Sequence, residues 1–336
     1  MTEAADTASI SDDDIRVVDR LQCLMCSSAG DILYGGLHDR LYDVPGEWSL
    51  RRCRNPDCGL IWLDPAPIPS ELWKIYRQYY THESNDGRAN GLAWRTLKKV
   101  YLVLLHISPL YYWRKHLYRM YLGRESPGRL LEVGCGNGGR LVELRALGWQ
   151  VVGQEVDSAA GASARKHGLD IRVGTLESLD LPAGSFDAVI CNHVIEHVPD
   201  PVKLLSDCYR LLNDDGIMVV VTPNTWSFGH RQFGRSWLAL DPPRHLQLFT
   251  PTSMRQAARQ AGIDHCRCWT SAVNAEIAAV GSYDIGARGR HQLGGPSPLH
   301  RRFKALLFQS WALFAFLFDA QSGDECVFWA RKVTSP

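Results

Sequence analysis

A glutamate and two histidines lie close together in the segment CNHVIEHV at 191–198. His193, Glu196 and His197 are residue types that can move a proton near neutral pH or bind a divalent cation. If the chain turns helically after His193, that residue and His197 share one face of the turn. We therefore expect catalytic chemistry here, and packing or hydrogen bonding within the loop is the alternative role for His197.

A further histidine, His245, lies in the segment DPPRHLQLFTP at 241–251. Pro242 and Pro243 stiffen the chain before it, so we expect Arg244 and His245 to face the substrate together. His245 is our first candidate for a base or a substrate contact, and His193 is the second.

Four cysteines form two close pairs, Cys23 with Cys26 and Cys53 with Cys58. Four thiolates on two tight turns can close a tetrahedral zinc site, and the segment between them offers little core of its own. We predict a structural zinc in a domain at 20–65, after a disordered polar lead-in at 1–19. Unrelated reduced cysteines are the alternative.

Residues 128–157 read as a strand, a glycine-rich turn, a helix and a second strand. The apolar run at 130–133 is typical of a buried parallel strand, and leucines at helical spacing follow the turn. Three glycines, which have no side chain, leave space at the turn: Gly134, Gly136 and Gly138. Open α/β sheets bind ligands at such a turn, so we expect a cofactor there.

Two acids bear on the charge of that cofactor. Glu155 ends the second strand, where an acid binds ribose hydroxyls, and the turn also satisfies the GxGxxG pattern of a dinucleotide site. Glu132 lies two residues before the first glycine, where its carboxylate would repel a pyrophosphate and attract the ammonium and sulfonium of S-adenosylmethionine. The sequence therefore favours S-adenosylmethionine over a dinucleotide.

Several segments resemble the class I S-adenosylmethionine-dependent methyltransferases, in the right order: EVGCGNG at 132–138, VVGQEVD at 151–157, SFDAVICNHVIEHVPDP at 185–201 and LLNDDGIMVVVTPN at 211–224. The resemblance covers roughly residues 128–270 and a last strand at 325–333. It implies an α/β, Rossmann-like fold with a seven-stranded sheet, and we place this domain at 128–336 with a helical insertion at about 275–322. The cofactor contacts that it implies are Glu132, Gly134, Gly136, Gly138, Glu155, Thr175, Leu176 and Asn192.

The cysteine pairs, with GLIWLDPAP after the last cysteine and IYRQYYTHES at 75–84, resemble the zinc-bearing leader of methyltransferases from bacterial sugar and polysaccharide pathways. This resemblance implies O-methylation of a small-molecule, saccharide or lipid-linked acceptor in a biosynthetic pathway. An RNA base methyltransferase is one alternative, disfavoured because acidic residues outnumber basic ones over the first 60 positions. A non-catalytic, membrane-associated binding module that keeps the cofactor for stability is another.

The segment at 191–198 also resembles a loop of the ubiquinone-type O-methyltransferases, in which two glutamates and a histidine can hold a divalent cation. Glu196 and His197 match this loop, whereas His193 stands where the first glutamate would be. The departure leaves two hypotheses open: a divalent cation at the acceptor site, or a metal-free histidine base.

Two stretches combine basic and aromatic side chains with short apolar runs, at 88–124 and at 301–318. This composition is typical of a helix at a membrane interface. A helical linker or lid at 66–127 is the alternative for the first stretch, and a core helix between the last two strands is the alternative for the second. The chain has no secretory signal and no apolar run long enough to span a bilayer. We expect a cytoplasmic protein, peripheral at the inner face of the membrane if these stretches bind lipid. A net charge of +1 gives no general attraction for nucleic acid.

Overall fold

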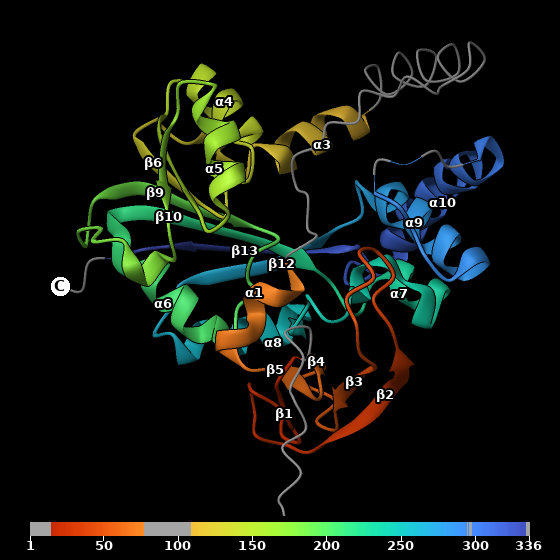
Figure 1. Cartoon of the computed structure of the whole chain (residues 1–336). Coiled ribbons are helices and arrows are strands. Elements are labelled where there is room, and N and C mark those ends of the chain that lie inside the picture. Colours follow the sequence, from red (N-terminus) through yellow and green to blue (C-terminus); the bar gives the residue numbers. More distant parts are fainter. Residues whose placement is uncertain (1–14, 77–108, 294, 296–297, 334–336) are drawn as a thin grey trace, which may run out of the picture.

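The computed structural model describes residues 15–76, 109–293, 295 and 298–333 (Figure 1). A large sheet has the strand order β12-β13-β10-β9-β6-β7-β8. Its strands are β6 (Arg129–Val133), β7 (Gln150–Glu155), β8 (Asp170–Val173), β9 (Phe186–Asn192), β10 (Leu212–Pro223), β12 (Cys266–Ser271) and β13 (Glu325–Arg331). The expected seven-stranded α/β sheet is therefore confirmed.

Strand direction in this sheet defines the place for a ligand. The strand β9 pairs in parallel with both β6 and β10, whereas β13 is antiparallel to β10 and β12. The chain fills the sheet outward from β6 to β8 and then returns to the other side of β6 with β9. A crevice at the carboxyl ends of β6 and β9 is the usual ligand site of such a sheet.

Helices cover both faces of the sheet, with α4 (Gly139–Ala146) and α5 (Ser158–Arg165) above it and α6 (Pro201–Leu211) and α8 (Pro251–Gln260) below it in Figure 1. Successive side chains of each strand point to opposite faces of the sheet. Leu131 and Val189 join a core with α6 and α8, and Leu130 and Ile190 join a core with α4. Because both faces are covered, the central strands β6 and β9 are mostly buried and mostly apolar.

The N-terminal part forms a smaller antiparallel sheet that the larger domain completes. Its strands, in the order β11-β4-β3-β2, are β2 (Gly30–Leu37), β3 (Trp48–Cys53), β4 (Ile61–Leu63) and β11 (Gln247–Leu248). Leu50 and Ile61 share one core with Trp237 and Leu246. A short pair, β1 (Val17–Val18) and β5 (Ala66–Pro67), lies beside it. The cysteine-bearing unit and the following domain are thus packed as one body.

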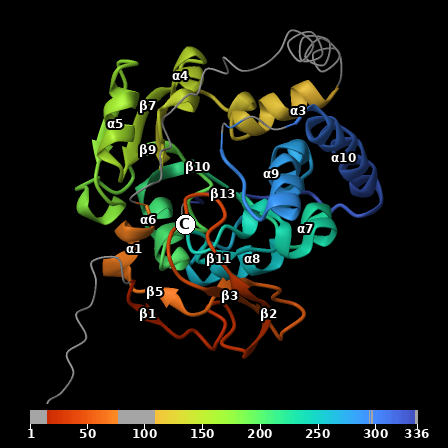
Figure 2. The ribbon, with the colours of Figure 1, turned by 45° about the vertical axis from the view of Figure 1, so that its right-hand side comes forward.

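Further helical segments lie outside these layers, and Figure 2 shows α7, α9 and α10 grouped together. They are η1 (Pro69–Glu71), α1 (Leu72–Ile75), α3 (Pro109–Tyr118), η2 (Leu122–Arg124), η3 (Leu176–Ser178), α7 (Phe228–Phe233), η4 (Gly234–Ser236), η5 (Leu238–Leu240), α9 (Ala275–Arg288) and α10 (Leu299–Phe318). None of the described helices is long and apolar enough to cross a bilayer.

The structure describes only part of the first basic, aromatic stretch but all of the second. The predicted linker or lid at 66–127 is seen only at its ends, because residues 77–108 lie outside the described residues. The second stretch, 301–318, lies within α10, which exposes Phe303, Trp311, Phe314 and Phe318 to solvent. Membrane contact through these stretches stays a prediction.

Candidate active site

The turn between β6 and α4 is built from glycines in the left-handed region. Gly134, Gly136 and Gly138 have φ values of +67°, +54° and +76°, which other residues rarely adopt. A Cβ on Gly134 would stand 2.5 Å from Val194, and one on Gly138 would stand 2.5 Å from Leu169. A Cβ on Gly136 would meet nothing within 4 Å. The turn therefore packs tightly on two sides and leaves open space at Gly136.

Glu132 lies buried beneath this turn. Its Oε1 accepts a hydrogen bond from Arg140 Nη1 at 2.6 Å, and its Oε2 has no hydrogen-bond partner within the described chain. Arg140 offsets part of the negative charge on which the sequence argument against a pyrophosphate rested, and burial raises the pKa of Glu132. The unpartnered oxygen still fits a cationic group of a cofactor, because leaving a buried acceptor unsatisfied costs about 1–3 kcal/mol.

Glu155 closes the other side of the turn. Its Oε2 accepts from the Gly136 N–H at 2.7 Å, and its Oε1 accepts from the backbone N–H groups of Val156 and Asp157 at 2.8 and 3.0 Å. These bonds fix the carboxylate and use three of its about four acceptor sites, which leaves one site, on Oε2, for a hydroxyl group. Nearby, Thr175 caps η3, in which Leu176 is buried. This set fits the ribose and adenine of S-adenosylmethionine.

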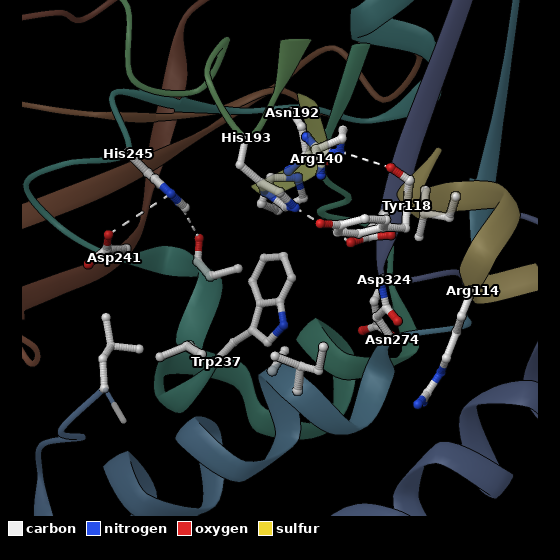
Figure 3. Close-up of a pocket in the computed structure, with 18 of the residues that line it drawn as sticks. Arg114, Tyr118, Arg140, Asn192, His193, Trp237, Asp241, His245, Asn274 and Asp324 are labelled. Atoms are coloured by element: carbon white, nitrogen blue, oxygen red, sulfur yellow. Dashed lines mark hydrogen bonds and ion pairs between the residues drawn. The ribbon is translucent and has the colours of Figure 1, made fainter. Parts of the chain in front are cut away.

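A cavity of about 930 Å³ lies at the ends of β9 and β10 (Figure 3). Asn192 and His193 line it where β9 ends, and Tyr118 and Arg140 line it on the side of α3 and α4. The remaining walls come from η5, α9, the segment before β11 and the start of β13. The cavity therefore adjoins the glycine turn through Arg140, which also binds Glu132.

His193 lies between two carboxylates. Its Nδ1 is 3.1 Å from Glu196 Oε1, and its Nε2 is 3.5 Å from Glu325 Oε1. Burial alone would lower its pKa, but the two carboxylates outweigh burial and raise the pKa to about 10. His193 is then protonated at neutral pH. A protonated ring can donate hydrogen bonds but has no site for a further proton, so these surroundings do not support the base role suggested for His193.

The rings of His197 and His245 meet edge to face, with centroids 4.6 Å apart. His197 Nδ1 is 3.1 Å from the Arg244 carbonyl oxygen, and His245 Nδ1 is 2.7 Å from that of Ala239. A carbonyl only accepts, so His245 Nδ1 carries the hydrogen and its Nε2, 4.0 Å from Asp241 Oδ2, keeps a lone pair. His197 Nδ1 also lies 3.0 Å from the Tyr76 hydroxyl, which can donate to it, so the tautomer of His197 is not fixed by the carbonyl. Burial, with the charge of His245, lowers the pKa of His197 to about 4.

Glu196 completes a group of three potential ligands. Its side chain is fully buried, and its Oε2 accepts from Thr222 Oγ1 at 2.9 Å. One ligand atom each from Glu196, His197 and His245 lies within 4.8 Å of the others. Two imidazoles and a carboxylate suit a divalent transition metal. The structure thus brings together the two segments, 191–198 and 241–251, that the sequence singled out separately.

Arg244 does not face the cavity, and the expectation that it contacts the substrate is wrong. Its guanidinium is fully buried and donates to both oxygens of Asp39 at 2.6 Å, and also to Asp241. Asp39 follows β2 in the N-terminal sheet. Arg244 therefore ties that sheet to the segment that carries His245, a contact between residues 205 positions apart that no local pattern reveals.

Comparisons with known proteins agree with this geometry. A family model described as a methyltransferase domain matches residues 106–265. A probable S-adenosylmethionine-dependent methyltransferase of Mycolicibacterium smegmatis is 36% identical over 122 residues, which are 35% of this chain and 48% of that protein. A ubiquinone biosynthesis O-methyltransferase of Cereibacter sphaeroides is 33% identical over 148 residues, 40% of this chain and 60% of that protein.

This chain carries a class I S-adenosylmethionine-dependent methyltransferase domain. It spans about half the length of the curated relatives it matches. A solved methyltransferase of Thermotoga maritima, described as a possible histamine N-methyltransferase, is 18% identical and covers 71% of this chain and 96% of its own, with a TM-score of 0.43.

From the sequence we named none of the individual residues on the far wall of the cavity. Trp237 and Asp324 line it, together with Asn274 and Ile277 of α9. Trp237 lies between two short helical segments and Asp324 directly before β13, and neither position belongs to a motif. The only signal was the acidic pair that opens the last strand, Asp324 with Glu325.

Asp324→Asn should stabilise the domain at alkaline pH and have less effect at acidic pH. Burial, with repulsion from Glu325 and Glu276, raises the pKa of Asp324 from 3.8 to about 7. The folded state then binds the proton more tightly than the unfolded state, so stability is highest below about pH 4 and falls as the pH rises to about 7. Over that window the loss is on the order of 4 kcal/mol.

Chemical denaturation of both proteins at about pH 5 and about pH 8 measures this effect. The stability gain of the variant should grow between the two pH values. The exposed residue Asp214 supplies a matched control, Asp214→Asn, which should shift neither curve. A gain that is the same at both pH values would contradict the account.

The four cysteines come together as predicted. Sγ atoms of Cys23 and Cys58 are 3.6 Å apart, those of Cys26 and Cys53 are 3.3 Å apart, and all four lie within 4.8 Å of one another. Zinc–sulfur bonds of about 2.3 Å in a tetrahedron place sulfurs about 3.8 Å apart. A hydrogen bond with Cys58 lowers the pKa of Cys23 to about 5. The cluster could bind zinc.

Proposed function

We propose that this chain transfers a methyl group from S-adenosylmethionine to a hydroxyl group of a small-molecule or saccharide acceptor. The observation that carries the proposal is the free Nε2 lone pair of His245, which lies with His197 and Glu196 next to a cofactor turn. The cavity volume, about 930 Å³, is in the range of small-molecule sites.

The cofactor, when bound, supplies a methyl group on a good leaving group. The chain then has to hold the two reactants in line and keep water out. Glu155 and Gly136 fix the turn that would receive the cofactor, through the hydrogen bond between them. Asn192 lies at the end of β9, between this turn and the acceptor cavity. Its position supports a role at the junction of the two reactants.

A hydroxyl acceptor must lose its proton during the transfer. His245 can take it at Nε2, because the bond from Nδ1 to the Ala239 carbonyl keeps that nitrogen free. The alternative is a divalent cation held by Glu196, His197 and His245, to which the hydroxyl would bind; the Nε2 lone pair of His245 would then bind the metal and could not take the proton. Such an ion lowers the pKa of a bound hydroxyl. The Nδ1 bond to a backbone carbonyl orients the His245 ring for this task, as partners of metal-bound histidines commonly do.

Metal analysis tests the role of the cation. If the cation rather than His245 activates the hydroxyl, the purified protein will hold a divalent metal beyond the ion of the cysteine cluster, and His245→Ala will lose that metal alone. Dialysis against a weak chelator should then lower turnover, and added metal should restore it. Turnover and metal content that are both insensitive to the chelator would instead assign the proton to His245 acting without a metal.

Label transfer tests the acceptor class. The protein is incubated with methyl-labelled S-adenosylmethionine and a crude extract, which is then divided into aqueous, lipid and RNA fractions. We expect label in small molecules of the aqueous fraction, or in the lipid fraction for a lipid-linked saccharide. Label confined to RNA would favour the RNA methyltransferase alternative. Absence of label despite bound cofactor would favour a binding module.

A further inference from the structure

We propose that the acidic wall of the cavity, formed by Asp324 and Glu325, binds an ammonium group of the methyl acceptor. The inference rests on the proposed function, because it concerns the acceptor of the same reaction. The acceptor would then be an amine-bearing polyol, such as an amino sugar or an amino alcohol. Its ammonium group lies at Asp324, and the atom that receives the methyl group is a different one.

Carboxylate oxygens of this wall have no hydrogen-bond partner among the described residues. Asp324 is only 6% exposed, and neither of its carboxylate oxygens makes a hydrogen bond of normal geometry within the described residues. The Gly229 N–H and the Ser227 hydroxyl lie near enough to lower its pKa, but not enough to outweigh burial. Glu325 Oε2 is also unpartnered. Buried acceptors without partners are rare and call for a ligand that supplies donors.

The charges around Asp324 leave it without a cation. Glu276 is paired with Arg114 at 2.5 Å, and Glu325 lies 3.5 Å from His193. No cationic side chain of the described ranges forms an ion pair with Asp324, although Glu325 and Glu276 both repel its charge. Burial and this repulsion raise the pKa of Asp324 to about 7, as expected of an acid that lacks a partner. An ammonium group would supply the missing positive charge and the missing donors.

Trp237 adds a donor beside these acceptors. Its Nε1 is buried and has no hydrogen-bond partner in the described part of the chain. A Cβ on Gly229 would clash with Asp324 Oδ1 and stand 3.3 Å from Trp237 Nε1, so donor and acceptor flank the same glycine. A hydroxyl oxygen can accept from the indole N–H while a neighbouring ammonium group donates to Asp324.

The wall is separate from the candidate proton acceptor. In Figure 3, Asp324 lies beside Asn274 on one side of Trp237, and His245 lies on the other side. Asp324 lies directly before β13 and Glu325 begins it, whereas His245 precedes β11. An acceptor held by its ammonium group at Asp324 could therefore extend across Trp237 and present a hydroxyl group to His245.

Binding of matched probes tests the proposal. Calorimetry compares glucosamine with glucose, and cyclohexylamine with cyclohexanol, in the presence of S-adenosylhomocysteine at neutral pH. The protein should bind the amine of at least one pair about tenfold more tightly than its neutral analogue. Comparison of the saccharide pair with the cyclohexyl pair shows whether the bound amine must be part of a sugar. Equal affinity within both pairs, or no measurable binding of any probe, would overturn the proposal.

Two variants and a control test whether the preference for the amine arises from Asp324 and Glu325. Asp324→Asn should abolish the preference for the amine and Glu325→Gln should weaken it, while the exposed control Asp214→Asn should retain it. Thermal unfolding verifies that each variant is folded. A preference that persists in Asp324→Asn would overturn the assignment.

The same titrations separate this proposal from the proposed function. S-adenosylhomocysteine should bind Asp324→Asn and the unmodified protein with affinities within about twofold of each other. If it binds neither protein, the methyltransferase proposal fails, while the amine preference is still read from the probes alone. If Asp324→Asn alone loses about tenfold in cofactor affinity, the wall serves the cofactor and the amine subsite is rejected.

Discussion

Replacing His245 with alanine should lower the rate of methyl transfer by about 100- to 10,000-fold, the range of general acid–base catalysis. The free Nε2 of His245 is the candidate proton acceptor, and its tautomer is fixed by the 2.7 Å bond from Nδ1 to the Ala239 carbonyl. The variant should bind S-adenosylhomocysteine with near-normal affinity, because His245 lies in the acceptor cavity and not at the glycine turn. Initial rates of label transfer and calorimetric titration measure the two quantities.

A matched control keeps this result interpretable. His265 is exposed and precedes β12, so His265→Ala should change neither the rate nor the affinity. Thermal unfolding of both variants verifies that the fold is retained. If His245→Ala turns over at nearly the normal rate, or loses cofactor affinity as strongly as it loses rate, the role given to His245 is wrong.

Replacing Cys58 with alanine should release zinc and destabilise the protein by several kcal/mol. Metal binding at structural zinc sites contributes on the order of 10 kcal/mol to folding in small domains. Cys58 is fully buried, and its carbonyl oxygen accepts from Thr250 Oγ1 at 2.8 Å, at the start of α8. Loss of the cluster should therefore disturb the larger domain as well as the N-terminal sheet.

Turnover should fall with the zinc content. The strand β4 follows Cys58 and pairs with β11, which begins two residues after His245. Zinc analysis, thermal unfolding and label transfer on the same preparations test this chain of contacts. Cys266→Ala is the control, because this partly exposed strand residue lies outside the cluster. A zinc content near zero in protein purified without chelators, or full zinc in Cys58→Ala, would contradict the prediction.

The sequence predicted those features that local patterns determine. The apolar run at 130–133 and the glycines after it predicted a buried strand and a ligand turn, and the structure has β6 and left-handed glycines there. The spacing of the four cysteines predicted their cluster. Such features follow from residues near one another in the chain, whose periodicity and turn chemistry can be read directly.

The features that the sequence did not reveal depend on contacts between distant residues. Arg244 looked like a substrate contact, but Asp39 holds it in the interior. His193 looked like a base, but Glu325, 132 positions further on, helps to raise its pKa to about 10. The pairing of β11 with β4 left no local pattern, because each segment contributes only a short strand. Both corrections concern charge, whose effect depends on what is buried beside it.

Titration of the purified protein with S-adenosylhomocysteine and, separately, with NADH tests the central claim most directly. The turn at Gly136, the unpartnered oxygen of Glu132 and the fixed carboxylate of Glu155 fit a cofactor that carries a cation and no phosphate. The account predicts about one S-adenosylhomocysteine per chain, with a Kd on the order of micromolar, and no heat with NADH. Binding of NADH together with no binding of S-adenosylhomocysteine would contradict it.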